Sequence, residues 1–314
     1  MTGRKPTIVV PFSNSCSDEA CQDIFLYLRP ESNGIKVESA IMRGLSGKEE
    51  YRERIKLVYL ANLPGSFLVQ KGVVRNHYKA RYIFARLGGK IFTPYMKRRF
   101  SEYFGIEYTG SRVIGAYEAL HNLHITEDEL FDTWVPVENM LIVDGQVIKK
   151  IGDVYVVNSD IPAILHKNNN KTDIAVMIFR THYTGEEFYR VIQDITGLLV
   201  EEGILHSKSM FSRVFHYSKG PFEQILDAVG FLYNERGEHL PLEKIRFYKY
   251  LVDRGIAPES IKQTLTNPIF LFDTEGREEE DSIFVKTRNM EYSESMGLIN
   301  RAKAQIFLDI YDRL

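Results

Sequence analysis

Residues 172–188 read TDIAVMIFRTHYTGEEF and carry the strongest fold signal in this chain. Every side chain from Ile174 to Phe179 is apolar, and a run without alternating polar positions predicts a strand that is buried on both faces. Thr184 is followed three residues later by Glu187, a capping box that predicts the start of a helix reaching about residue 202. The stretch therefore predicts a strand-to-helix unit of an α/β or ferredoxin-like sheet.

A similar unit follows 34 residues later. The triplet at 182–184 is His-Tyr-Thr, with Phe188 four residues after its last member, and the triplet at 216–218 is His-Tyr-Ser, with Phe222 at the same spacing. The similarity has two explanations, a true duplication or the apolar and capping positions that all such units share. Either one predicts tandem βα units in this half of the chain.

The N-terminal part predicts a βα unit followed by a segment, residues 46–134, that is almost wholly helical. Serine and threonine N-caps, first-turn prolines and glycine stops mark the helix ends. The predicted elements are a strand at 7–12, a helix with Ala20, Ile24, Phe25 and Leu28 on one face, a strand at 35–42, and helices at 46–62, 66–87, 94–105, 111–123 and 126–134.

After Pro136 the pattern changes to short strands at 140–143, 146–151 and 154–158, which predict a small antiparallel meander. We therefore expect a domain boundary near 136. The predicted domains are residues 1–135, an N-terminal βα unit plus a helical domain with a basic face, and residues 136–314, an α/β domain of ferredoxin-like or open-sheet type. The latter is expected to end in helices at 241–254 and 258–266, a hairpin of 269–273 and 283–287 with an acidic turn at 275–281, and a helix at 293–312. The fold class is mixed, α/β or α+β.

The composition is typical of a soluble globular protein, with 44% hydrophobic and 26% charged residues among 314. No apolar run approaches the roughly 18 residues that predict a membrane-spanning helix. Only two cysteines occur, Cys16 and Cys21, so a disulfide framework is not expected and the reducing cytoplasm is the predicted location.

The basic residues are concentrated between Lys71 and Arg112, a stretch that contains ten lysines and arginines but only two glutamates. On a continuous helix over 66–87, four of them form a stripe opposite the apolar face, and two tyrosines lie between them. This arrangement predicts binding of a polyanion, most plausibly RNA or single-stranded nucleic acid, with tyrosines stacking on bases. The predicted anion-binding residues are Lys71, Arg75, Lys79, Arg86, Lys97, Arg98 and Arg99, and the predicted stacking residues are Tyr78 and Tyr82.

Two other functions remain open. The serine-rich loop at 13–17 and the junctions after Arg180 and at His216 lie where α/β proteins bind ligands, which favours an enzyme or sensor for a phosphorylated small molecule. The candidate catalytic residues are Cys16, His182 and His216. A helix start favours the thiolate form of a cysteine, which is a nucleophile, and a histidine can act as an acid or a base near neutral pH. A scaffold or homo-oligomer, in which the basic residues meet the acidic turn of another copy, is the third hypothesis.

Several motifs are absent from the sequence, among them GxGxxG, GxxxxGK[ST], GxSxG and HExxH. Their absence argues against the common dinucleotide, P-loop, serine-hydrolase and zinc-protease classes. No cysteine, histidine or carboxylate spacing is diagnostic of a metal site. The sequence thus predicts no cofactor and no metal, and it leaves open whether the protein is an enzyme.

Overall fold

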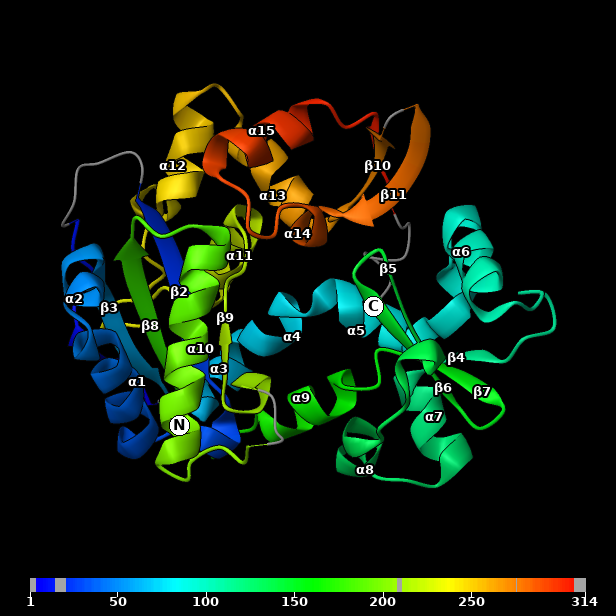
Figure 1. The fold of residues 1–314 in the computed structure, drawn as a ribbon, viewed down its shortest axis with the longest axis horizontal. Helices are drawn as coiled ribbons and strands as arrows, with labels where there is room; N and C mark the ends of the chain where they lie inside the picture. Colours follow the sequence, from blue (N-terminus) through cyan, green and yellow to red (C-terminus); the bar gives the residue numbers. More distant parts are fainter. Residues whose placement is uncertain (1–3, 15–20, 208–210, 275, 308–314) are drawn as a thin grey trace. The chain divides into compact units, whose positions relative to one another are not determined.

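The computed structural model describes residues 4–14, 21–207, 211–274 and 276–307. The chain forms two compact units (Figure 1). Unit 1 consists of Met1–His77, Lys167–Pro258 and Thr287–Gly297, and unit 2 consists of Tyr78–His166, Glu259–Lys286 and Leu298–Leu314. This partition does not coincide with the expected boundary near residue 136. The meander after Pro136 shares one hydrophobic core with the helices that precede it, so it belongs to the same unit as they do.

Unit 1 is built on a five-stranded sheet in which all neighbouring strands are antiparallel. Two strand-helix-strand segments interleave in this sheet, because the last strand of each segment lies beyond a strand of the other. This interleaving is the split βαβ arrangement of ferredoxin-like folds. In spatial order the strands are β1 (Thr7–Val10), β3 (Ile55–Leu63), β8 (Ile174–Thr181), β2 (Gln22–Leu28) and β9 (Phe215–Tyr217).

Helices cover both faces of this sheet. On one face, apolar side chains of α1 (Ile35–Gly47), α2 (Glu49–Arg54) and α10 (Gly185–Glu201) form a core with alternate residues of β2, β8 and β9 (Figure 1). On the other face, α11 (Pro221–Phe231) and α12 (Arg246–Asp253) contact β2. Unit 1 also contains α3 (Gly65–Lys71), α4 (Val73–His77) and most of α15 (Tyr292–Asn300).

The sequence prediction was wrong at β2, at α1 and at β3, and the burial of both sheet faces explains the first of these errors. All residues of β2 are buried, so Ile24, Phe25 and Leu28 lack the polar alternation of a half-exposed strand and imitate a helix face. The opposite error occurs at α1, where Val37 and Ala40 are buried at helical spacing in a segment predicted to be a strand. The helix predicted at 46–62 is in fact α2 followed by β3.

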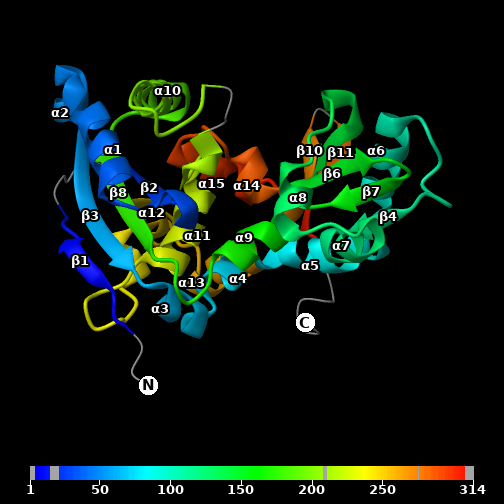
Figure 2. The same ribbon diagram turned by 90° about the horizontal axis from the view of Figure 1, so that it is seen from below.

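Unit 2 contains two small sheets around a second core, and Figure 2 shows its strands β4, β7 and β6. The predicted meander is confirmed as β5 (Met140–Val143), β6 (Gln146–Ile151) and β7 (Val154–Val157), with β4 (Val113–Gly115) parallel to β7. The second sheet contains β10 (Ile269–Thr274), β11 (Arg277–Ser282) and β12 (Ala304–Gln305). The helices are α5 (Lys79–Leu87), α6 (Pro94–Phe104), α7 (Ala116–Leu123), α8 (Glu127–Asp132), α9 (Ile161–Lys167), α13 (Pro258–Thr266) and α14 (Ile283–Lys286).

Most local capping signals were accurate, but the predicted helix start at Ser46 was wrong, because Ser46 lies within α1. The Thr126–Glu129 and Thr184–Glu187 capping boxes are both formed, and Thr93 caps α6. The C-terminal hairpin differs from the prediction, because the acidic residues from Arg277 onward form strand β11 itself and 283–286 is helical. The mixed fold class, with tandem βα units β8–α10 and β9–α11 and an antiparallel meander, is confirmed.

Candidate anion-binding cavity

A buried ion pair organises one end of the unit 1 sheet. Asp23 of β2 and Arg180 of β8 are cross-strand partners, so their side chains extend from the same face. The Arg180 Nε lies 2.7 Å from Asp23 Oδ1, and the two side chains are 2% and 0% exposed. The other carboxylate oxygen accepts the backbone N–H of Arg246 at 2.9 Å, at the start of α12. Asp23 therefore fixes both the guanidinium group and the helix end.

A hydrogen-bond network extends from this pair. The backbone N–H of Asp23 donates to the hydroxyl of Tyr292 at 3.4 Å, and that hydroxyl donates to Gln224 Oε1 at 3.0 Å. Gln224 in turn donates to Gln22 Oε1 at 3.1 Å. Burial raises the pKa of Tyr292 well above its usual value, so the residue remains a phenol that donates. The network joins β2, α11 and α15 around Arg180.

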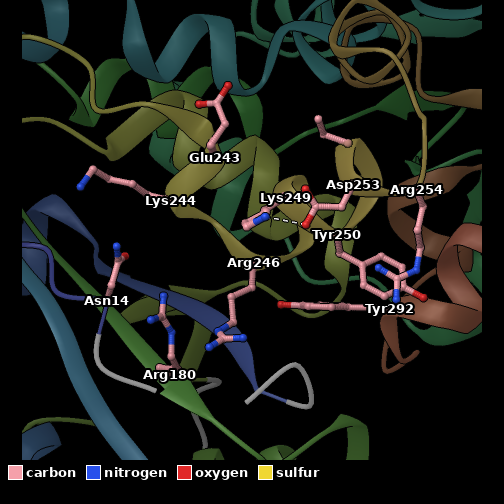
Figure 3. Close-up of a pocket in the computed structure, with 11 residues that line it drawn as sticks. Asn14, Arg180, Glu243, Lys244, Arg246, Lys249, Tyr250, Asp253, Arg254 and Tyr292 are labelled. Atoms are coloured by element: carbon pink, nitrogen blue, oxygen red, sulfur yellow. Dashed lines mark hydrogen bonds and ion pairs between the residues drawn. The ribbon is translucent and has the colours of Figure 1, made fainter. Parts of the chain in front are cut away.

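A cavity of about 530 Å³ opens beside this network, and Figure 3 shows side chains of Arg180 and Arg246 pointing into it. Five lining residues are cationic and two are acidic, and Asp23 adds a third carboxylate behind Arg180. The formal charge of these groups is therefore +2, which favours an anionic ligand. The cavity is lined by Asn14, Arg180, Glu243, Lys244, Arg246, Lys249, Tyr250, Val252, Asp253, Arg254 and Tyr292.

Aromatic rings hold several of these cations in place. The guanidinium carbon of Arg254 lies 3.6 Å from the ring centroid of Tyr250, and Lys249 forms an ion pair of 2.5 Å with Asp253 in the next turn. The ring of Phe12 lies 5.7 Å from the Arg180 guanidinium and 5.4 Å from Lys244 Nζ. The cation–π contacts restrict Arg180, Lys244 and Arg254 without neutralising them, whereas the ion pair with Asp253 neutralises Lys249. The net formal charge of the cavity stays positive.

Most residues of this cavity were not predicted from the sequence. Arg180 and the 13–17 loop, to which Asn14 belongs, were candidates for a ligand site, whereas 241–254 was predicted only to be a helix. The prediction for 71–112 was based on basic residues interleaved with aromatic ones, and the same pattern occurs in 241–254. Lys244, Arg246, Lys249 and Arg254 alternate there with Phe247, Tyr248 and Tyr250.

The basic stripe predicted on a single long helix does not exist as such. Gly72 has φ +63° and ends α3, and a second break at Tyr78 separates α4 from α5. Lys71 and Arg75 belong to unit 1, whereas Tyr78, Lys79, Tyr82 and Arg86 belong to unit 2. The interpretation of these charges as one aligned helical stripe is therefore wrong, because it required an unbroken helix.

In unit 2 several of the predicted residues have partners within the chain. The ring of Tyr82 contacts that of Tyr117 at 5.8 Å, and the Arg86 guanidinium lies 5.3 Å from the Tyr117 centroid. On α6, Arg99 pairs with Glu102 at 3.0 Å and Arg98 lies 3.9 Å from the same carboxylate. Lys97 Nζ lies 5.5 Å from the ring of Tyr108.

The two candidate catalytic histidines do not converge. Cys16 lies outside the described residues. His182 is exposed, and its ring nitrogens lie 3.4 and 3.6 Å from the Sγ of Cys21. His216 pairs with Tyr27 of β2, whereas Thr181, next to His182, pairs with Gln22 of the same strand. Gln22 and Tyr27 are five positions apart, which corresponds to roughly 17 Å along a strand. The βα strands β8 and β9 are parallel to each other but have β2 between them.

His216 belongs to a buried cluster instead. Its Nε2 lies 3.8 Å from Glu223 Oε1 and 3.8 Å from Asp227 Oδ2, and Asp227 Oδ1 lies 3.6 Å from Nε2 of His77. Tyr27 stacks on the His216 ring at 4.7 Å. Burial lowers the pKa of both histidines and raises the pKa of both carboxyl groups, so the neutral forms are favoured. The cluster is a protonation-sensitive part of the core.

Unit 2 contains two neighbouring buried carboxyl groups, those of Asp144, in the Asp144-Gly145 turn, and Glu280. Burial raises the pKa of Asp144 to about 10, with the neighbouring carboxyl of Glu280 adding to the effect. The Thr93 hydroxyl donates to Glu280. Native Asp144 therefore keeps a proton that the unfolded chain releases above about pH 4, so the stability that protonated Asp144 contributes to unit 2 is lost progressively as the pH rises.

We expect Asp144→Asn to stabilise unit 2, because asparagine is neutral in both states. The gain in free energy of unfolding should be small near pH 4 and reach about 1 to 3 kcal/mol at pH 8. Urea-dependent hydrogen exchange of the β5 and β6 amides measures it. Asp153→Asn is the control, because that carboxylate is 81% exposed in the next turn; an equal gain in both variants contradicts the prediction.

Within the described residues, no three or more histidine, cysteine, aspartate or glutamate side chains are arranged to hold a metal ion. None of the helices described is long and apolar enough to cross a membrane. Comparison with protein-family models, with curated proteins and with solved structures finds no match to this chain.

Proposed function

We propose that unit 1 binds a phosphate-bearing small molecule in the cationic cavity. The observation that carries this proposal is the concentration of five lysines and arginines around one concave site, anchored by the buried Arg180. Guanidinium groups form strong, directional hydrogen bonds with phosphate oxygens, which supports an organic phosphate over a simple halide. The volume lies within the roughly 300–1,000 Å³ of small-ligand sites.

The position of the cavity also supports this proposal. It lies where β8 ends, close to the junction with α10, and Asn14 contributes from the loop that follows β1. Strands β1 and β8 run parallel to each other with β3 between them, so their C-terminal ends lie at the same edge of the sheet. Of the three functions that the sequence left open, the enzyme or sensor of a phosphorylated molecule therefore agrees best with the geometry.

Binding of RNA or single-stranded nucleic acid through residues 71–99 stays a prediction from charge, and so does assembly into a homo-oligomer. The two-cysteine composition keeps the cytoplasm as the proposed location.

The proposal is tested by isothermal titration calorimetry with inorganic pyrophosphate. Lys244→Glu places a negative charge in the cavity, and we expect it to weaken binding by at least about tenfold, because a charge-assisted hydrogen bond contributes roughly 1.5–3 kcal/mol. Lys36→Glu is the matched control, with the same change of charge on the exposed side of α1. Equal weakening by both variants, or no binding at millimolar pyrophosphate, contradicts the proposal.

A further inference from the structure

A second cavity, of about 320 Å³, shares a wall with the cationic one, because Lys244 lines both. Its chemistry is different. Three aromatic and three aliphatic residues supply most of its wall, so it favours a flat apolar group over an anion. These residues are Phe12, Tyr59, Tyr233, Ile8, Pro11 and Leu240.

The other four lining residues, Asn234, Glu235, Arg236 and Lys244, are polar or charged, so the apolar part of the wall is the part formed by the rings and aliphatic side chains. The hydroxyl of Tyr59 donates to the carbonyl oxygen of Tyr233 at 2.8 Å and accepts the backbone N–H of Tyr233 at 3.3 Å. Both tyrosines are buried, and Phe67 packs edge-on against Tyr233 at 4.9 Å. Tyr59 and Tyr233 are only 0% and 7% exposed, so the ring of half-buried Phe12 is the main surface for stacking, and the tyrosines add apolar contact behind it.

Phe12 connects the two cavities. Its ring lines the aromatic cavity, and the same ring contacts the cationic heads of Arg180 and Lys244, which line the other. A single ligand that enters both cavities therefore meets stacking surfaces and phosphate-binding cations next to each other. All of these residues belong to unit 1.

We propose that the ligand is a nucleoside phosphate, whose phosphate groups lie among the cations and whose base lies in the aromatic cavity. This inference rests on the proposed function and adds the ligand class to it. A nucleobase suits the aromatic cavity because every base has a π-face, and stacking on an aromatic side chain is tolerant of base identity. A phosphate without an aromatic ring, such as a sugar phosphate, uses only half of the site.

The experiment compares four probes by calorimetry: inorganic pyrophosphate, ribose 5-phosphate, adenosine diphosphate and tetra-adenylate. We expect adenosine diphosphate to bind about ten- to a hundredfold more tightly than pyrophosphate, in line with the contribution of one stacked base. Ribose 5-phosphate should gain no such advantage. Tetra-adenylate should bind no more tightly than adenosine diphosphate.

The matched variants are Ile8→Glu and Val9→Glu on strand β1. Ile8 lines the aromatic cavity, whereas its neighbour Val9 does not line it and is 60% exposed. Ile8→Glu should abolish the advantage of adenosine diphosphate and leave pyrophosphate binding unchanged, and Val9→Glu should alter neither. Leu240→Asp, in the same cavity, is the second variant if Ile8→Glu does not fold.

Each alternative outcome has one meaning. Equal affinities for pyrophosphate and adenosine diphosphate would refute the nucleotide inference and leave the proposed function standing. If none of the phosphates binds, the proposed function itself is wrong. Much tighter binding of tetra-adenylate would identify a nucleic-acid strand as the ligand and overturn the mononucleotide. Equal loss of both ligands in Ile8→Glu would place the base elsewhere.

Discussion

Replacing Asp23 by alanine is expected to lower the free energy of unfolding of unit 1 by about 3 to 5 kcal/mol. The substitution leaves the guanidinium of Arg180 buried, at 2% exposure, without the carboxylate that lies 2.7 Å from it. It also removes the acceptor of the Arg246 backbone N–H, at the start of α12. A buried charge that loses its partner costs far more than an exposed ion pair contributes.

Hydrogen exchange of the β8 amides in urea measures this loss. Tryptophan fluorescence does not report on it, because the only tryptophan, Trp134, belongs to unit 2. The control is the double variant Asp23→Leu with Arg180→Met, which removes both charges and should be more stable than Asp23→Ala. If the double variant is the less stable of the two, an uncompensated charge is not the cause.

Acidification from pH 6.5 to 4 is expected to destabilise the wild type by about 3 kcal/mol relative to His77→Gln. Burial, with the charge of Arg29 adding to it, lowers the pKa of His77 to about 4. In the unfolded chain the imidazole takes up a proton below about pH 6.5, whereas the native imidazole does not until the pH approaches 4. The stability that neutral His77 provides is therefore present above pH 6.5 and is lost as the pH falls.

The groups that face His77 are titratable as well, so the comparison must be made between variants. Asp227 Oδ1 lies 3.6 Å from its Nε2, and the rings of Tyr27, Phe231 and His216 surround it. Hydrogen exchange of the β2 amides in urea gives the free energy of unfolding of both proteins at each pH. The difference between the two values isolates the contribution of His77. His182→Gln, at an exposed histidine, is the control variant. A constant difference between the wild type and His77→Gln would show that His77 does not titrate in this range.

Several local elements were predictable because their signals are short-range. The apolar run from Ile174, the Thr126 and Thr184 capping boxes and the Asp144-Gly145 turn each specify a conformation within a few residues. The errors occurred where conformation depends on distant partners. β2 is a strand because β8 and β9, whose paired residues lie 149 to 191 positions away in sequence, pair with it on both sides.

The candidate site shows the same division. The sequence contains the chemistry of the site, an excess of cations near tyrosines and phenylalanines, and it established the mixed α/β class. The residues of the cavity, however, come from position 14, the end of β8, the segment 243–254 and Tyr292. They meet because cross-strand register places Asp23 opposite Arg180, and Asp23 then binds the start of α12. Such convergence arises from long-range pairing and packing, which no local pattern of residues encodes.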